Sequence, residues 1–393
     1  MAHQRDRAIG STIAHALKQS PCVGLVGMRQ TGKSTLLKQF AARYFTFDQA
    51  AFSARFEREG AALLEESGYP LALDEIQKYP PAFDALKFSI DHQHRRGRFL
   101  ISGSVRFSSR RQIRESLTGR IFLLELYPFS LAECHRQTPS EFLSLASSLN
   151  DTQLADRLQK RAWATSAQVR HYMEAGGLPG ICFLRDPRLR EQHFANHLDT
   201  LLGRDIQLVR QVKLSVTRLN TLLMELAKNQ GLPCRVVDLA RKAACSQPTA
   251  KAILEALEGL FLIRRFGKTY FLEDAGLSHF LCPLGKNLTR YDVMRCVYYE
   301  FRLQLSCGLK HHALLENYTT RGGSDIPFLI SYKSGQELAL MVEEEALPSD
   351  KAVKGLSWYK KKKSRVRALI LCDTAKPFHT ATGILCLPWR WVF

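Results

Sequence analysis

Short apolar runs alternate with helical stretches along the first third of the chain. These runs lie at residues 22–27, 45–48, 70–74, 98–102 and 121–126. Short, continuously apolar runs are typical of strands that are buried on both faces of a parallel sheet. Their alternation with helices predicts an α/β sandwich, in which ligands lie beyond the carboxyl ends of the strands.

From about residue 140 the pattern becomes helical, with apolar periodicity over 143–160 and 191–209. Three amphipathic segments follow at 219–228, 236–243 and 247–260, and two strand-like runs at 261–266 and 269–272. This order resembles a winged helix, whose third helix can enter a DNA groove. Glu255 and Glu258 in that third helix would repel phosphates, so packing against protein stays an equal alternative.

Residues 27–34 read GMRQTGKS, a complete G-x-x-x-x-G-K-S motif between an apolar run and a helical segment. Strand, glycine-rich loop and helix form the context that a P-loop requires. Lys33 would neutralise the β- and γ-phosphates of ATP, and the Ser34 hydroxyl would bind Mg²⁺. The predicted nucleotide-binding residues are Gly27, Met28, Arg29, Gln30, Thr31, Gly32, Lys33, Ser34 and Thr35.

A second acidic element follows the P-loop. The apolar run Leu71–Leu73 ends in Asp74 and Glu75. Asp74 is the predicted partner of Ser34 in holding Mg²⁺, and Glu75 is the predicted general base for the attacking water. An acidic pair can also be a plain helix cap. The P-loop upstream favours the catalytic interpretation, so the pattern predicts ATP hydrolysis.

Two more residues are candidates for catalysis. Ser104, with Ser102 as its alternative, follows the apolar run at 98–102 and could orient the water near the γ-phosphate. Small polar residues are also common in turns. Arg120 precedes the run at 121–126 and could act as an arginine finger on its own nucleotide or on a neighbouring subunit's. An ordinary surface arginine explains that position equally well.

The chain has 56 Lys and Arg against 37 Asp and Glu, which gives a formal net charge of +19. Such charge favours polyanions such as DNA, although a basic solvated surface is the simpler alternative. Basic residues cluster at 95–98, 106–114 and 360–367. The ten cysteines include no CxxC pair, which argues against a zinc ribbon. Without a membrane span or a secretory signal, we expect a cytoplasmic protein that does not bind membranes.

The segments GMRQTGKSTLL, LALDEIQK, LISGS, SLTGR and LYPFSLAE resemble the prokaryotic AAA-type (AAA+-like) P-loop ATPase family that carries a C-terminal domain of unknown function. EAGGLPG, LDTLLGRDI and TYFLEDAGL are similar to the second half of that family. The resemblance implies an AAA+-like ATPase domain, a winged helix and a restriction-endonuclease-like α/β domain. We expect them at 1–140, 216–285 and 286–393, with a helical linker or lid at 141–215 between the first two.

The resemblance also implies a set of nuclease residues in the last domain. Glu300 and Glu343 match two carboxylates of that set. Pro327 stands where a metal-binding Asp is expected, and Glu345 stands where a Lys is expected. A carboxylate cannot supply the positive charge of that lysine. We therefore predict that this domain lacks nuclease activity and binds or scaffolds instead.

Three functions fit these patterns. The first is an ATPase that acts on DNA, which the charge and the helix–turn–helix favour. The second is a nucleotide-operated switch that regulates a protein partner. The third is a non-catalytic ATP-binding scaffold, against which Glu75 argues. A trans-acting Arg120 would require a homo-oligomer, so oligomeric state stays open.

Overall fold

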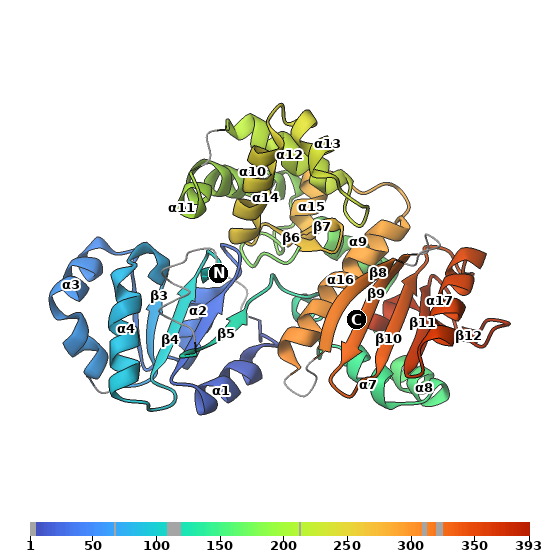
Figure 1. The fold of residues 1–393 in the computed structure, drawn as a ribbon, viewed down its shortest axis with the longest axis horizontal. Helices are drawn as coiled ribbons and strands as arrows, with labels where there is room; N and C mark the ends of the chain where they lie inside the picture. Colours follow the sequence, from blue (N-terminus) through green and yellow to red (C-terminus); the bar gives the residue numbers. More distant parts are fainter. Residues whose placement is uncertain (1–4, 67, 108–118, 212–213, 309–312, 320–324) are drawn as a thin grey trace. The chain divides into compact units, whose positions relative to one another are not determined.

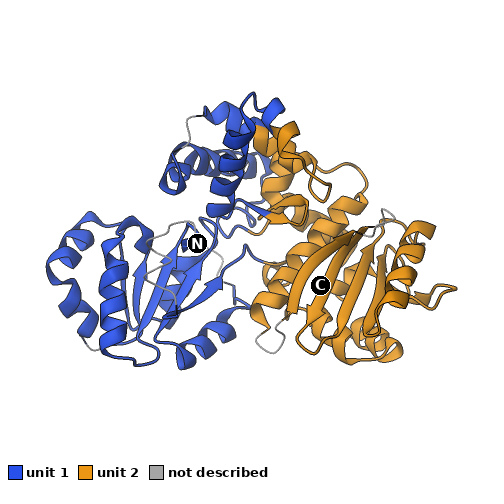
Figure 2. Cartoon of the chain, in the orientation of Figure 1, with its two compact units in different colours: residues 1–129, 178–221, 240–264 blue, residues 130–177, 222–239, 265–393 orange. Residues whose placement is uncertain are grey.

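The computed structural model describes residues 5–66, 68–107, 119–211, 214–308, 313–319 and 325–393. The chain forms two compact units (Figure 2), and it passes between them several times. The expected linker at 141–215 is divided, with residues up to 177 in unit 2 and residues from 178 in unit 1. Unit 1 comprises residues 1–129, 178–221 and 240–264, and unit 2 comprises residues 130–177, 222–239 and 265–393.

A parallel five-stranded sheet is the centre of the N-terminal part of unit 1 (Figure 1). Strand β1 lies between β4 and β5, and β3 lies between β4 and β2. All four neighbouring pairs are parallel, which confirms the predicted α/β fold. The elements are β1 (Cys22–Val26), β2 (Arg43–Thr46), β3 (Leu71–Asp74), β4 (Phe99–Gly103), β5 (Ile121–Glu125), α1 (Gly10–Gln19), α2 (Lys33–Phe40), α3 (Ala50–Glu65) and α4 (Pro81–His92).

Unit 1 also contains a helical segment that follows residue 178. Helix α10 (Pro187–Thr200) begins at Asp186, whose side chain accepts a hydrogen bond from the Arg188 amide. It continues into a π-helical turn, Leu201–Asp205, and then into α11 (Ile206–Val209). The periodic stretch at 191–209 is therefore one helical path with a wide turn inside it. Wide turns of this kind are often found at functional sites.

Three helices and a strand pair follow in the order predicted from the periodicity. They are α12 (Val216–Lys228), α13 (Val236–Lys242), α14 (Gln247–Gly259), β6 (Ile263–Phe266) and β7 (Thr269–Leu272). Ser246 caps α14 by accepting from the Thr249 amide. Glu255 on α14 pairs with Arg210 at 3.1 Å, so one of the two acidic residues faces a protein cation.

Unit 2 is built around a six-stranded sheet with the order β12-β13-β11-β10-β9-β8 (Figure 1). Strands β8, β9 and β10 are antiparallel neighbours, whereas β10, β11 and β13 run parallel. Side chains that alternate along a strand pack into two different apolar clusters. On β10, for example, Leu340 belongs to one cluster and Ala339 to the other. The elements are α16 (Arg290–Cys307), β8 (Ala313–Thr319), β9 (Asp325–Tyr332), β10 (Glu337–Val342), α17 (Asp350–Lys362), β11 (Val366–Cys372), β12 (Phe378–His379) and β13 (Leu385–Pro388).

The described part of unit 2 also contains α15 and several short helices between residues 131 and 175. The stretch at 143–160 was expected as one helix, but it forms two, because Asn150 caps the second with reciprocal bonds to Gln153. Such a capping box starts a new helix. No helix in the described part of the chain is both long and apolar enough to cross a bilayer. These helices are α6 (Leu131–Cys134), α7 (Phe142–Ser148), α8 (Asp151–Arg161), α9 (Ser166–Ala175) and α15 (Ala275–Leu281).

Candidate nucleotide site

The P-loop joins β1 to α2 through a backbone that only glycine adopts easily. Gly27 has φ 156°, and a Cβ there would lie 2.3 Å from the carbonyl oxygen of Leu126. Gly32 has φ 95°, in the left-handed region. The Thr31 hydroxyl donates to the Met28 carbonyl at 2.9 Å. The two glycines and the hydrogen bond of Thr31 therefore set the conformation of the loop, which is the role that the P-loop motif predicts for its glycines.

Lys33 lies inside this loop. Its Nζ donates to the carbonyl oxygens of Gly27 at 2.9 Å and Met28 at 2.8 Å. Burial lowers the pKa of Lys33 to about 8, and the negative charges of Glu75 and Asp74 oppose that change. The ammonium group is thus held at the loop, with the two predicted catalytic carboxylates within electrostatic reach.

Ser34 and Asp74, the two predicted Mg²⁺ ligands, meet at Tyr44. The Tyr44 hydroxyl donates to Asp74 Oδ2 at 2.5 Å, and the Ser34 side chain acts on the pKa of the same hydroxyl. Asp74 is 2% exposed at the end of β3, and Ser102 hydrogen-bonds to its other oxygen. A hydroxyl and a carboxylate oxygen are ligand types that suit a magnesium ion that also keeps water and phosphate ligands. No sequence motif pointed to Tyr44, which lies on the neighbouring strand β2.

Glu75 follows Asp74 with φ 53°, an uncommon conformation for a residue with a side chain. The Ser104 hydroxyl donates to Glu75 Oε2 at 3.0 Å. Gln77 Nε2 contacts the same oxygen and also lies 3.1 Å from Ser104 Oγ. The predicted base is therefore oriented by two polar side chains. Gln77 was missed, although it stands in the same segment, two residues after Glu75.

Ser104→Ala removes one of the two donors that orient Glu75. We expect kcat for ATP hydrolysis to fall by about three- to tenfold, the effect of one hydrogen bond, with ATP affinity unchanged. Steady-state phosphate release measures this, with Ser53→Ala on α3 as the control. A change in ATP affinity without a change in kcat would mean that Ser104 contacts the nucleotide and not the base.

Arg120 lies against α4. Its Nε and Nη2 contact the two carboxylate oxygens of Asp91 at 2.6 and 2.8 Å. Ser102, the alternative to Ser104, hydrogen-bonds with Asp74, the predicted Mg²⁺ ligand. The finger role of Arg120 stays a prediction.

Two of the basic residues grouped by sequence are structural. Arg98 is fully buried and donates to the carbonyls of Ser89 and Gln93, both at 2.9 Å. Arg367 donates to two carbonyls near the end of α7 and pairs with Asp151 at 2.5 Å. The guanidinium groups of both residues are occupied by hydrogen bonds to protein groups, and these hydrogen bonds connect different segments of the chain. Arg110, Arg111 and Arg114 lie outside the described residues.

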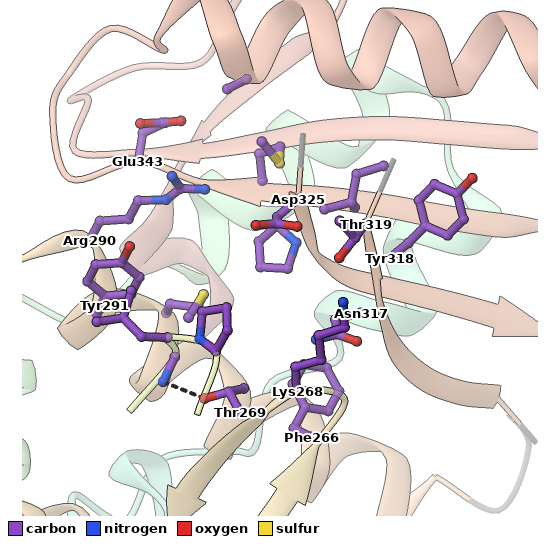
Figure 3. Close-up of a pocket in the computed structure, with 18 of the residues that line it drawn as sticks. Phe266, Lys268, Thr269, Arg290, Tyr291, Asn317, Tyr318, Thr319, Asp325 and Glu343 are labelled. Carbon is purple, nitrogen blue, oxygen red and sulfur yellow. Dashed lines mark hydrogen bonds between the residues drawn. The ribbon is translucent and has the colours of Figure 1, made fainter. Parts of the chain in front are cut away.

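The residues matched to a nuclease are only partly brought together. Pro327 and Glu343 line one cavity of unit 2, of about 180 Å³ (Figure 3). Asp325 and Arg290 line it as well. Glu300 is not among the residues that line it; it is buried in α16, where Gln304 donates to its Oε1 at 3.0 Å. Glu345 is exposed after β10.

Burial raises the pKa of Glu300 to about 7 from an ordinary 4.5. Between these values the unfolded chain loses the proton while the folded chain keeps it, so stability falls as pH rises to about 7. Glu300→Gln should flatten this profile and gain up to about 3 kcal/mol over wild type between pH 4 and pH 8. Urea unfolding across this range measures it; parallel profiles for the two proteins would contradict the burial argument.

Residues 19–135 match the family model of an AAA domain, and residues 166–271 match that of a domain of unknown function (DUF8612). Uncharacterized proteins of Mycobacterium bovis and Mycobacterium tuberculosis are each 27% identical over 305 residues. The matched region is 73% of this chain, and it spans 62% of the length of either relative.

Two solved structures are also similar. A Walker-type ATPase of Pyrococcus abyssi has a TM-score of 0.44 and 13% identity, with 69% of this chain and 94% of that chain covered. A signal-transduction ATPase with numerous domains from Pyrococcus horikoshii, which has a tetratricopeptide repeat sensor, has a TM-score of 0.27 and 11% identity over 79% and 48%. The sequence match, the P-loop and the parallel sheet agree: residues 19–135 form a P-loop ATPase domain of the AAA type.

Proposed function

We propose that this protein binds ATP with Mg²⁺ at residues 27–35 and hydrolyses it with Glu75 as the general base. The observation that carries this proposal is the meeting of Lys33, Asp74, Glu75 and Ser104 at one site. The negative charges of Asp74 and Glu75 act on the pKa of Lys33, and the Ser104 hydroxyl donates a hydrogen bond to Glu75. These groups follow the carboxyl ends of β1, β3 and β4, where parallel sheets bind ligands.

Each residue has a chemical task in this proposal. Lys33 exchanges its carbonyl partners for phosphate oxygens and neutralises their charge. Ser34 and Asp74 would hold Mg²⁺, which would supply positive charge beside the phosphates. Glu75, oriented by Ser104 and Gln77, takes the proton from the attacking water. Tyr44 aligns Ser34 with Asp74.

We further propose that hydrolysis is coupled to DNA. The net charge of +19 supports this, together with an exposed basic stretch at the end of α17. Lys360, Lys361 and Lys362 are exposed there. Trp358 is 42% exposed, and the Lys362 ammonium lies 4.8 Å from its ring centroid. Cations beside an exposed aromatic ring suit phosphates and unstacked bases.

The test is phosphate release from ATP with and without single- and double-stranded DNA, at low and moderate salt. We expect DNA to stimulate the wild type, and the stimulation to fall steeply with salt. Trp358→Ala with Lys361→Glu should reduce it, and Lys18→Glu on α1 serves as the charge-matched control. A rate that ignores DNA at both salt concentrations would overturn the coupling to DNA.

If DNA has no effect on the rate, the alternative function is a nucleotide-operated switch that regulates a protein partner. The passage of the chain between its two units supports this alternative, because a nucleotide bound in unit 1 would act on segments continuous with unit 2. Tight ADP binding and slow turnover without DNA would favour it.

For the C-terminal part we propose a degenerate restriction-endonuclease-like domain without nuclease activity. The chain order supports the fold, since the helix with Glu300 (α16) precedes the strand with Pro327 (β9) and then β10, which ends just before Glu343; the additional strand β8 lies between α16 and β9. Pro327 in the metal-binding position and the burial of Glu300 support the loss of activity. Metal-dependent nicking of DNA by the purified wild type would contradict it.

A further inference from the structure

A segment just before α1 contacts the far end of the P-loop inside unit 1. Arg7 lies in this segment, and the Gly10 amide donates to its carbonyl at 2.9 Å, which fixes the residue at the start of the helix. Its Nη1 donates to the Thr31 carbonyl at 2.9 Å, and its Nη2 donates to the Tyr127 carbonyl at 2.6 Å. The Phe129 ring covers the guanidinium, with its centroid 4.6 Å from Cζ. One side chain therefore donates to carbonyls from two different parts of the chain.

The second of these carbonyls belongs to a segment that runs beside the start of the loop. The Leu126 amide donates to the Val26 carbonyl at 2.7 Å, immediately before the first glycine of the loop. Tyr127 is the next residue along that segment. Arg7 therefore connects the end of the loop, at Thr31, to the chain that flanks its beginning. Arginine suits this task because its planar guanidinium presents several N–H donors in a fixed geometry.

The carbonyl at the end of the loop is one half of a peptide unit whose other half is the Gly32 amide. In a trans peptide the C=O and the N–H point in opposite directions, so holding the Thr31 carbonyl also sets the direction of the Gly32 N–H. A peptide beside glycine can rotate at little steric cost, since glycine tolerates both signs of φ. The side-chain hydrogen bonds inside the loop, from the Thr31 hydroxyl and from Lys33, end on carbonyls nearer the start of the loop. Arg7 is thus the described side chain that fixes this peptide.

The Gly32 amide donates to no acceptor among the described residues. Backbone amides of a P-loop bind phosphate oxygens. We propose that Arg7 is a positioning residue of the nucleotide site, which holds the Thr31 carbonyl so that the Gly32 N–H faces the phosphates that ADP and ATP share. Arg7 acts through the backbone of the loop and makes no contact with the nucleotide itself. This inference rests on the proposed ATP site and extends it to the segment before α1.

Arg7→Ala is expected to weaken the binding of ADP and ATPγS by the same factor, about 10- to 100-fold, the effect of losing a charged hydrogen-bond donor. The factor is shared because both nucleotides carry the phosphates concerned. At saturating ATP, kcat should stay near the wild-type value, since the lost interaction is the same in the ground state and in the transition state. Calorimetric titration and phosphate release measure these quantities. Arg58→Ala, the same change at an exposed arginine of α3, is the control.

A conservative variant and a chemical rescue separate positioning from support of the fold. Arg7→Lys keeps the charge but lacks the planar set of donors, so it should recover only part of the affinity. Methylguanidinium added to Arg7→Ala should restore part of the affinity, and it should have no such effect on Arg58→Ala. If Arg7 only attached its segment to the domain, its loss would lower the unfolding temperature without changing the affinity of the folded protein. Wild-type affinity for ADP in folded Arg7→Ala would overturn the inference.

The peptide itself can be observed by NMR. The sequence contains three Thr–Gly pairs, at 31–32, 118–119 and 382–383. Protein labelled at the threonine carbonyl carbon and at the glycine nitrogen therefore gives three selected amide signals, and Thr31→Ser removes the one from Gly32. Without nucleotide, Arg7→Ala should shift or broaden this signal, because the carbonyl loses its donor and the peptide can rotate. The other two signals should stay unchanged.

The outcomes separate the inference from the proposed function. If the wild type binds ADP but does not hydrolyse ATP, the hydrolysis proposal fails, and the ADP affinities still decide on Arg7. If the wild type hydrolyses ATP but Arg7→Ala keeps both the Gly32 signal and the ADP affinity of the wild type, only the inference is wrong. If the wild type binds neither nucleotide, both are wrong.

Discussion

Glu75→Gln is expected to lower kcat for ATP hydrolysis by about 10²- to 10⁴-fold, the usual contribution of a positioned general base. The amide has the shape of the carboxylate and can still accept from Ser104, whose hydroxyl lies 3.0 Å from Glu75 Oε2. It cannot take a proton from water. ATP affinity should stay within a few-fold of wild type, because Lys33, Ser34 and Asp74 are untouched. Phosphate release and titration with a fluorescent ATP analogue separate the two effects.

The matched control for this variant is Glu59→Gln. Glu59 is exposed on α3, where it pairs with Arg55 at 2.9 Å, so the same chemical change there should leave kcat unchanged. Hydrolysis by Glu75→Gln at the wild-type rate would show that another group is the base.

Lys33→Ala is expected to weaken ATP binding by about 10- to 100-fold, as for the loss of a charged hydrogen-bond donor to a phosphate. The ammonium group sits in the loop, 2.9 and 2.8 Å from the carbonyls of Gly27 and Met28, so no large rearrangement is needed for it to reach phosphate. Hydrolysis should be lost as well, because the same charge stabilises the transition state. Titration with the fluorescent analogue measures the affinity.

Lys18→Ala is the control, because it makes the same chemical change at an exposed lysine of α1. Thermal unfolding of both variants shows whether the loop still folds, since Lys33→Ala removes two buried hydrogen bonds. A folded Lys33→Ala protein with wild-type ATP affinity would mean that the nucleotide binds elsewhere.

The parts of the site that the sequence predicts share one property: they are local. The P-loop residues 27–35 are contiguous, and Asp74 and Glu75 end a single apolar run. Tyr44 and Arg7 could not be found this way. Tyr44 reaches the site because β2 pairs with β3, and Arg7 because the segment before α1 lies against the P-loop. Such contacts depend on strand order and on the path of distant segments, which periodicity does not encode.

Clusters of charge were a weaker guide than motifs. Arg95, Arg96 and Arg98 are close in sequence, yet Arg98 is fully buried. It lies just before the central strand β4, and its guanidinium donates to the carbonyls of Ser89 and Gln93 at the end of α4. Composition cannot separate such a structural arginine from one that binds DNA. The three helices between residues 216 and 259 were predicted close to their observed bounds, because they have strong amphipathic periodicity.

The most direct test of the central claim is the release of inorganic phosphate from ATP by the purified wild-type protein, with Mg²⁺ and with EDTA. Lys33→Ala, measured in parallel, sets the background. The proposed site predicts turnover that requires Mg²⁺ and exceeds this background at every ATP concentration. Turnover that persists in EDTA, or equal rates for the wild type and Lys33→Ala, would contradict it.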